Sequence, residues 1–321
     1  MPVQVLGLLL VAALLHAGWN VLLKTADDPL RTAGRGMVVG AASLIPTGFV
    51  GWLLIGRPPI PAEAWLLAVV SGVFEAAYFV FLSAAYRRGD LSLVYPIARG
   101  TAPVLAVSVG VIVLGERLGP LGAIGVACLL VGILVLQRPW AVLHRGGDQP
   151  KHVREASWLA VATGVTIACY SALDRNGARL IEPWLYAALI WTFTAVFLVG
   201  WIALVDRRAG RTEGDPRLDD APAPPVSTLD RRGRVWAAAS SSWGRAVIGG
   251  LVTVGAYLLV LVAYRMAPLT AVAPVRESAI VLVTGWGTLR LGEAAGQRSR
   301  MVRVGASAVI LIGGFLLALE R

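Results

Sequence analysis

Ten long apolar runs dominate this sequence and restrict what it can fold into. They cover about 3–23, 36–55, 64–85, 91–114, 119–137, 156–173, 184–205, 244–264, 269–290 and 301–319. A bilayer core of about 30 Å needs roughly 20 consecutive apolar residues in a helix. The runs are apolar on all sides, whereas helices of a soluble bundle keep a polar face. With 57% hydrophobic and 15% charged residues, the chain is predicted to be an all-α, polytopic membrane protein with about ten transmembrane helices.

The net charge of +10 would suggest a nucleic-acid partner for a soluble protein. Here most Lys and Arg residues fall in the loops after the first, third, fifth, seventh and ninth runs. The positive-inside rule places such loops in the cytoplasm. We therefore expect a multi-pass protein of the plasma (inner) membrane with both termini outside, the lipid bilayer as a partner, and no bound nucleic acid.

An internal repeat divides the chain into two halves. Segments 85–96 (AYRRGDLSLVYP) and 263–274 (AYRMAPLTAVAP) share Ala, Tyr, Arg, Leu, Val and Pro at equivalent positions, and Leu-Gly-Glu recurs at 114–116 and 291–293. Five helices per half is an odd number, so the two copies are inverted relative to each other. Inverted repeats suit alternating access to a site near the midplane. The expected units are a five-helix repeat over 1–137, a polar connector over 138–155, and a second repeat over 156–321 containing a polar loop at 206–243.

Several motifs resemble those of one transporter family. They are His16-Ala-Gly-Trp-Asn20-Val-Leu-Leu-Lys24, the run from Tyr86 to Gly100, and the paired Gly-Glu turns. Together they resemble the EamA-type branch of the drug/metabolite transporter superfamily. The resemblance implies ten helices in two EamA-like repeats, and a gradient-coupled or facilitative carrier that often exports amino acids, metabolites or drug-like compounds. The second repeat departs from the first, because Pro274-Val-Arg276-Glu277 stands where the first has Pro96-Ile-Ala-Arg99.

Three charged side chains in the spans follow these prolines. Arg99 lies in the fourth run, and Arg276 and Glu277 lie in the ninth. A charge at the bilayer centre is costly and therefore needs a function or a partner. Because a proline lacks the backbone N–H, a helix can start or kink at each site. The repeat aligns Arg99 with Glu277, so the two should lie near each other. Either arginine could hold a substrate carboxylate or phosphate; the alternative is an internal Arg–Glu pair that only fixes packing.

Glu75 lies in the middle of the third run, and its repeat counterpart is Thr253. Burial among apolar groups favours the neutral, protonated form of a carboxyl. Glu75 is therefore the candidate proton-coupling residue. The alternative is a carboxyl that hydrogen-bonds to a neighbouring helix.

The remaining candidates are polar or aromatic residues that could line a central cavity. His16, Trp19 and Asn20 share one helix face, and the tyrosines with them are Tyr78, Tyr95 and Tyr170. Asp174 ends the sixth run and is expected to be a solvated cap or a partner of Arg175 or Arg179, with a role in the cavity as the alternative. The glutamates of the Gly-Glu turns, Glu116 and Glu293, are interpreted as structural. Glycine pairs within the spans, such as Gly36 with Gly40 and Gly250 with Gly255, indicate closely packed helices.

The sequence has no phosphate-binding loop, no metal-ligand spacing and no hydrolase motif. We therefore expect no cofactor, no metal and no enzyme activity. The predicted function is secondary transport of small organic metabolites or drug-like solutes, with export as the expected direction. The expected substrate is anionic or zwitterionic. Two alternatives stay open, which are a flippase for a lipid-linked sugar and a membrane accessory protein without transport.

Overall fold

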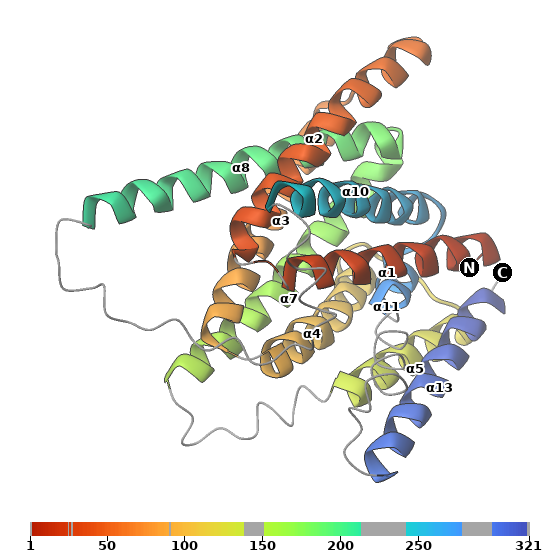
Figure 1. Cartoon of the computed structure of the whole chain (residues 1–321). Coiled ribbons are helices and arrows are strands. Elements are labelled where there is room, and N and C mark those ends of the chain that lie inside the picture. Colours follow the sequence, from red (N-terminus) through yellow and green to blue (C-terminus); the bar gives the residue numbers. More distant parts are fainter. Residues whose placement is uncertain are drawn as a thin grey trace.

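The computed structural model describes residues 2–24, 26, 28–89, 91–137, 151–212, 242–277 and 297–319. Over these residues the chain forms helices and no strands. The first half contains α1 (Val3–Lys24), α2 (Pro29–Leu54), α3 (Ala62–Arg88), α4 (Leu91–Ile112) and α5 (Pro120–Gln137). The second half contains α7 (Lys151–Leu180), α8 (Pro183–Thr212), α10 (Ser242–Met266), α11 (Leu269–Glu277) and α13 (Gln297–Leu319). Figure 1 shows their arrangement along the chain.

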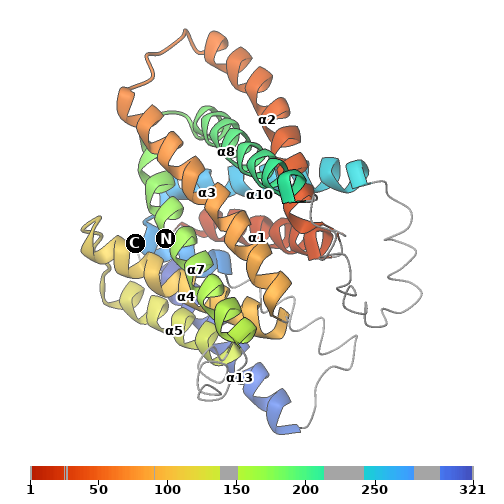
Figure 2. The ribbon, with the colours of Figure 1, turned by 90° about the vertical axis from the view of Figure 1, so that its left-hand side faces the viewer.

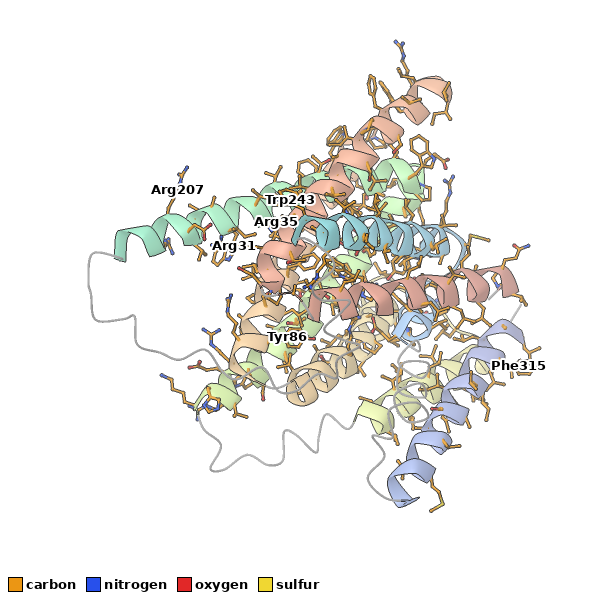
Figure 3. All side chains as sticks on the ribbon, in the orientation of Figure 1. Arg31, Arg35, Tyr86, Arg207, Trp243 and Phe315 are labelled. Carbon is orange, nitrogen blue, oxygen red and sulfur yellow. The ribbon has the colours of Figure 1, made fainter. Side chains whose placement is uncertain are left out.

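Membrane-length helices confirm a multi-pass, all-helical membrane protein. Among the residues that the structure describes, five helices are long and apolar enough to cross a bilayer, namely α2, α3, α7, α8 and α10. Shorter apolar stretches occur in α1, α4, α5 and α13. In the ninth predicted span only Leu269–Glu277 is described, and 278–290 lies outside the described residues. Large apolar side chains such as Leu311 and Phe315 on α13 are exposed, as expected for a surface in contact with lipid. Figure 3 shows Phe315 pointing away from the bundle.

Three helices extend further into the polar segments than the sequence predicted. α7 begins at Lys151, within the predicted connector, and the predicted loop 206–243 loses residues at both ends to α8 and α10. Ion pairs between helices stabilise two of these extensions: Arg88 lies 3.4 Å from Glu155, and Arg31 lies 2.9 Å from Asp206. A helix satisfies its own backbone hydrogen bonds, so it continues past the apolar boundary where its side chains find partners. Residues 138–150 and 213–241 lie outside the described residues.

Helices from the two halves pack against one another throughout the bundle. α2 contacts α8, α4 contacts α11, and α5 contacts α13. α3 packs against α7 and α8, while α10 packs against α1 and α2. Figure 2 shows α3 crossing α7, with α5 and α13 at one side of the bundle. The buried polar residues of the core come mainly from α3, α4, α7, α8, α10 and α11.

Glycines allow some of these helices to approach closely. A Cβ added to Gly250 on α10 would lie 2.5 Å from the carbonyl oxygen of Gly36 on α2. A Cβ on Gly313 of α13 would lie 2.6 Å from the carbonyl oxygen of Gly125 on α5. Lipid provides no hydrophobic drive for helix association, so small residues that permit close contact take that role. The close packing expected from the glycine pairs is confirmed at Gly36 and Gly250.

The prolines of the fourth and ninth spans do not interrupt their helices. α4 runs from Leu91 through Pro96, and α11 runs from Leu269 through Pro274. Neither helix starts at its proline, so that part of the expectation is wrong. Each proline lies in the second turn, where the missing N–H leaves the carbonyl four residues earlier without its usual partner.

Candidate functional site

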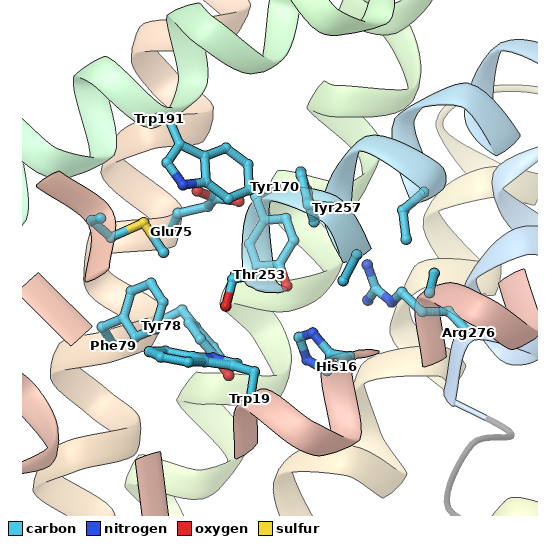
Figure 4. Close-up of a pocket in the computed structure, with 14 residues that line it drawn as sticks. His16, Trp19, Glu75, Tyr78, Phe79, Tyr170, Trp191, Thr253, Tyr257 and Arg276 are labelled. Atoms are coloured by element: carbon cyan, nitrogen blue, oxygen red, sulfur yellow. The ribbon is translucent and has the colours of Figure 1, made fainter. Parts of the chain in front are cut away.

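A small buried cavity lies at the junction of the two halves. Its volume is about 40 Å³, and its walls come from α1, α2, α3, α7, α8, α10 and α11 (Figure 4). It is lined by Ala12, His16, Trp19, Met37, Glu75, Tyr78, Phe79, Tyr170, Trp191, Thr253, Ala256, Tyr257, Val260 and Arg276. Ligand sites for drug-sized molecules are about 300–1,000 Å³. In this conformation the polar side chains therefore surround a space much smaller than an organic solute.

Most of the candidate residues predicted from the sequence meet at this cavity. His16 and Trp19 reach it from α1, as their shared helix face predicted, and Tyr170 reaches it from α7. The others in its wall are Glu75, Tyr78 and Arg276. The side chains of Asn20 and Tyr95 lie outside the described residues. The structure thus brings together candidates from both halves of the chain.

Two arginines share one buried carboxylate beside the cavity. Arg99 Nη1 lies 2.9 Å from Glu277 Oε2, and Arg276 Nε lies 3.2 Å from Glu277 Oε1. All three side chains are less than one-tenth exposed. Arg276 Nη1 also donates to Ser171 Oγ at 3.4 Å. The expectation that Arg99 lies near Glu277 is confirmed. Two guanidinium groups against one carboxylate leave one net positive charge, and Arg276 carries it to the cavity wall.

His16 is hydrogen-bonded to Arg99 of this cluster. Its Nε2 lies 3.0 Å from Arg99 Nη2. A guanidinium can only donate hydrogen bonds, so Nε2 accepts this one. The ring is then neutral, with its proton on Nδ1. His16 therefore adds no positive charge to this side of the cavity.

Glu75 lies in the opposite wall, on α3. Its side chain is buried, and its Oε2 accepts a hydrogen bond from Thr194 Oγ1 on α8 at 2.8 Å. Within the described ranges it forms no ion pair. A buried carboxylate without a counter-charge is unfavourable, and protonation removes the charge. The surroundings of Glu75 therefore allow its carboxyl to hold a proton. The hydrogen bond from Thr194 also fits the alternative, in which Glu75 only bonds to a neighbouring helix.

Asp174 is placed differently from the expectation. It is fully buried, because α7 continues to Leu180 instead of ending near residue 173. Its Oδ1 accepts from Ser71 Oγ on α3 at 2.6 Å and from Tyr186 Oη on α8 at 3.3 Å, and its Oδ2 accepts from Tyr257 Oη on α10. The predicted solvated cap, or partner of Arg175 or Arg179, is wrong. Hydroxyl groups from three helices bind this carboxyl instead.

Sequence reasoning missed several residues of this region. They are Ser71, Tyr186, Trp191, Thr194 and Tyr257. Helical spacing could have identified two of them, because Ser71 lies one turn before Glu75 and Tyr257 one turn after Thr253. The others lie on α8, whose sequence contains no acidic or basic side chain at this depth.

Aromatic rings form a continuous part of the cavity wall. Tyr78 and Tyr170 pack edge to face with ring centroids 6.2 Å apart, and Tyr170 packs in the same way against Tyr257. Trp191 lies 5.3 Å from Tyr257. The indole Nε1 of Trp191 is buried and has no hydrogen-bond partner within the described part of the protein. The wall therefore combines apolar surface with hydroxyl and indole groups that can hydrogen-bond a ligand.

The turn between α4 and α5 is anchored to α11. Gly115 adopts a φ of 63°, and the following Glu116 accepts hydrogen bonds from the backbone N–H groups of Leu269 at 2.8 Å and Thr270 at 2.9 Å. Arg175 Nε lies 3.5 Å from the same carboxylate. A carboxylate stabilises a helix N-terminus through its free N–H groups and the helix dipole. Glu116 thus has the structural position expected of it, and Glu293 lies outside the described residues.

Two comparisons with known proteins match part of the chain. The profile of the EamA-like transporter family matches residues 4–138. The chloramphenicol-sensitive protein RarD of Pseudomonas aeruginosa is 29% identical over 147 residues, which is 44% of this chain and 44% of RarD. The chain thus matches less than half the length of this curated relative.

A solved crystal structure shares the fold over nearly the whole chain. The superposition covers 99% of this chain and 98% of the other, with a TM-score of 0.64 at 20% sequence identity. At this identity the likeness concerns the fold alone. Residues 4–138 thus resemble the EamA-like transporter family, and the membrane-length helices agree with a multi-pass membrane protein.

Proposed function

We propose that this protein is a secondary transporter that exports small organic solutes through the central cavity. The observation that carries the proposal is the buried polar cavity between the two halves, with one excess positive charge at Arg276. A binding site near the midplane between two halves is the arrangement that alternating access requires. No covalent chemistry is assigned to these residues.

The proposed architecture is a pair of inverted five-helix repeats, and the packing of the helices supports it. If α1, α2, α3, α4 and α5 correspond to α7, α8, α10, α11 and α13, each major contact has a counterpart. The contact of α3 with α7 matches that of α10 with α1, and the contact of α3 with α8 matches that of α10 with α2. α2 with α8, α4 with α11 and α5 with α13 each map onto themselves. α11 takes part in these contacts through Leu269–Glu277.

In the proposed cycle, this structure is a conformation closed at both ends. On the side assigned to the outside, Glu116 joins the turn after α4 to α11 and Arg175. Arg31 pairs with Asp206, and Arg88 with Glu155, on the side assigned to the cytoplasm. Opening to either side then requires separation of the contacts at that end.

The proposed substrate is anionic or zwitterionic. Its carboxylate or phosphate would bind Arg276, which lines the cavity and can exchange its bond to Glu277 for one to the solute. Arg99 would keep Glu277 in place during this exchange. Glu75, in the opposite wall, would take the coupling proton. The two roles are separated because Glu75 belongs to α3 and Arg276 to α11.

A second candidate function is supported by an apolar groove. This groove has a volume of about 460 Å³ and is lined by Ile45, Gly48, Phe49, Trp52, Ile60, Trp65, Leu185, Ala188, Leu189, Thr192 and Phe193 of α2, α3, α8 and the α2–α3 connection. Such a groove suits an acyl or prenyl chain and favours a flippase for a lipid-linked sugar. A membrane accessory protein without transport is the third possibility. Its prediction is that solute levels do not depend on the cavity residues.

An efflux assay distinguishes these functions. Cells with and without the protein are loaded with a panel of amino acids, organic anions and drug-like compounds. The panel includes chloramphenicol, because RarD is described as a chloramphenicol-sensitive protein. The proposal expects faster efflux of at least one solute with the protein, and loss of the difference when a protonophore collapses the proton gradient. Unchanged efflux of every solute, together with altered lipid-linked sugar in the outer leaflet, would favour the flippase.

The proposed location and orientation need separate measurements. Fractionation is expected to place the protein in the plasma (inner) membrane. A reporter that is active only in the cytoplasm should stay inactive when fused to the C-terminus, because the basic loops place both termini outside. Activity of that reporter would reverse the assigned orientation.

A further inference from the structure

We propose that Asp174 is a second protonation site of the transport cycle and exchanges its proton with the cavity through the hydroxyl group of Tyr257. This inference rests on the proposed function, because it adds a carboxyl to the coupling machinery assigned to Glu75. It is argued from the burial of Asp174, from the chemistry of its partners, and from the different positions of its two tyrosines.

Asp174 is fully buried and bound only by hydroxyl groups. Ser71 at 2.6 Å, Tyr186 at 3.3 Å and Tyr257 donate to it. Throughout the described residues it forms no ion pair. A permanently ionised buried carboxylate normally has a cationic partner, as Glu277 has in Arg99 and Arg276. Asp174 lacks that partner, so its charge is not fixed by the structure.

Hydroxyl partners can accommodate both states of the carboxyl. They donate to the ionised form, and each can accept a hydrogen bond from the protonated form by rotating its O–H. An arginine in the same place would only donate and would hold the carboxyl ionised. The three hydroxyl groups therefore support gain and loss of a proton without rearrangement of the helices.

Tyr257 connects Asp174 to the cavity, whereas Tyr186 does not. Tyr257 lines the cavity and bonds to Asp174 Oδ2, but Asp174 itself and Tyr186 are absent from the cavity wall. For release, the Tyr257 hydroxyl proton passes to an acceptor in the cavity as the proton on Asp174 Oδ2 moves to Tyr257 Oη. Tyr257 is neutral before and after the exchange, and one proton leaves Asp174.

The surroundings couple this site to Glu75 and to the charged cluster. Ser71, which bonds to Asp174, lies one turn from Glu75 on α3, so the two carboxyls lie close together. Like charges at short distance disfavour ionisation of both. On the helices packed against α7, the titratable and charged groups that face this region include Glu75 and Tyr78 of α3, Arg99 of α4, Tyr186 of α8, Tyr257 and Tyr264 of α10, and Arg276 and Glu277 of α11. Among these, Arg276 adds positive charge, and Arg99 and Glu277 offset each other.

Infrared spectroscopy tests the protonation of Asp174 without any knowledge of the solute. The full-length protein is reconstituted in phosphatidylcholine vesicles, and the C=O stretching band of protonated carboxyl groups is followed from pH 5 to pH 9, with a D₂O shift to identify it. Because Glu75 also takes a proton, the test compares Glu75→Gln with the double variant that adds Asp174→Asn. The proposal expects a titrating band in Glu75→Gln that is lost in the double variant. A spectrum of Glu75→Gln in which no band titrates, or a titrating band that survives in the double variant, would overturn it.

Two matched tyrosine variants test the proton path and keep the proposal falsifiable if Asp174→Asn fails to fold. Tyr257→Phe and Tyr186→Phe each remove one hydroxyl bonded to Asp174, and both should shift the frequency of the band. After a pH jump, Tyr257→Phe should slow the change of the band at least tenfold, while Tyr186→Phe should leave its rate near that of the wild type. Equal rates in both variants would rule out the path through Tyr257.

The outcome is separate from that of the proposed function. If efflux proves independent of Arg276 and Glu75, the transport proposal fails whatever the infrared band shows. If efflux depends on those residues but Asp174 does not titrate, only the present inference fails.

Discussion

Arg99 on α4 and Glu277 on α11 form a buried ion pair that joins the two halves of the chain, with Nη1 and Oε2 2.9 Å apart. The carboxylate is shared with Arg276, so its removal leaves two buried guanidinium groups without their anion. Breaking a buried pair in this way costs about 3–5 kcal/mol. The pair is therefore a structural connection as well as the support for the cation in the cavity wall.

Glu277→Gln should consequently destabilise the protein strongly. We expect a lower midpoint of thermal unfolding in detergent, measured by fluorescence-detected gel filtration, and less protein in the membrane. Arg99→Gln should have a smaller effect, because Glu277 keeps its bond to Arg276. The exchange Arg99→Glu with Glu277→Arg should recover part of the loss. A midpoint for Glu277→Gln equal to that of the wild type would contradict this interpretation.

Glu75 should carry a large part of the pH dependence of transport. Gln at this position imitates the neutral, protonated carboxyl and still accepts the hydrogen bond from Thr194. We expect Glu75→Gln to fold normally and to transport solute in proteoliposomes with a weaker pH response than the wild type, the remainder being due to Asp174. Glu63→Gln, an exposed position at the start of the same helix, serves as the control and should keep the wild-type profile. A full pH response in Glu75→Gln would exclude it as the coupling residue.

Glu116 should contribute to stability through its hydrogen bonds to the N-terminus of α11. Loss of a helix cap costs about 0.5–2 kcal/mol. Glu116→Ala removes acceptors for two backbone N–H groups and also the carboxylate near Arg175. We expect a value at the upper end of that range from thermal or denaturant unfolding. The stability of Glu116→Gln should lie between those of the wild type and Glu116→Ala, because the Gln amide keeps one acceptor oxygen. No difference between Ala and wild type would show that α11 is held by other contacts.

Close packing of α2 and α10 should depend on Gly250. A Cβ there would lie 2.5 Å from the carbonyl oxygen of Gly36, so even Gly250→Ala should separate the helices and lower the yield of folded protein. Gly200→Ala on α8 is the matched control, because no atom lies within 4 Å of the position its Cβ would take. The measurement is the folded fraction by gel filtration after detergent extraction. Equal folded fractions for the two variants would contradict the close contact.

The sequence predicted the helices and part of the site for identifiable physical reasons. Long apolar runs have few structures available in lipid, so the spans could be located. The internal repeat aligned Arg99 with Glu277, and the structure places the two in contact. Helical spacing placed His16 and Trp19 on one face, and both reach the cavity.

Other features depend on packing that no local pattern contains. Asp174 lies at the end of an apolar run, where a solvated and a buried position look alike in sequence. Its burial follows from the extension of α7 to Leu180 and from the contacts of α7 with α3, α8 and α10. Trp191 and Tyr257 reach the cavity because of how α8 and α10 pack against the bundle, and aromatic residues are common throughout membrane spans.

Solute efflux by Arg276→Gln, compared with Arg265→Gln at equal membrane levels, tests the transport site in the central cavity most directly. Both variants remove an arginine that pairs with a glutamate, but Arg276 lines the cavity and Arg265 lies on the surface. A lost hydrogen bond to a charged group costs about 1.5–3 kcal/mol, which corresponds to roughly a tenfold to hundredfold weaker apparent affinity. We expect this loss of apparent affinity for Arg276→Gln and near wild-type efflux for Arg265→Gln. Unchanged efflux in Arg276→Gln would contradict a transport site in the central cavity.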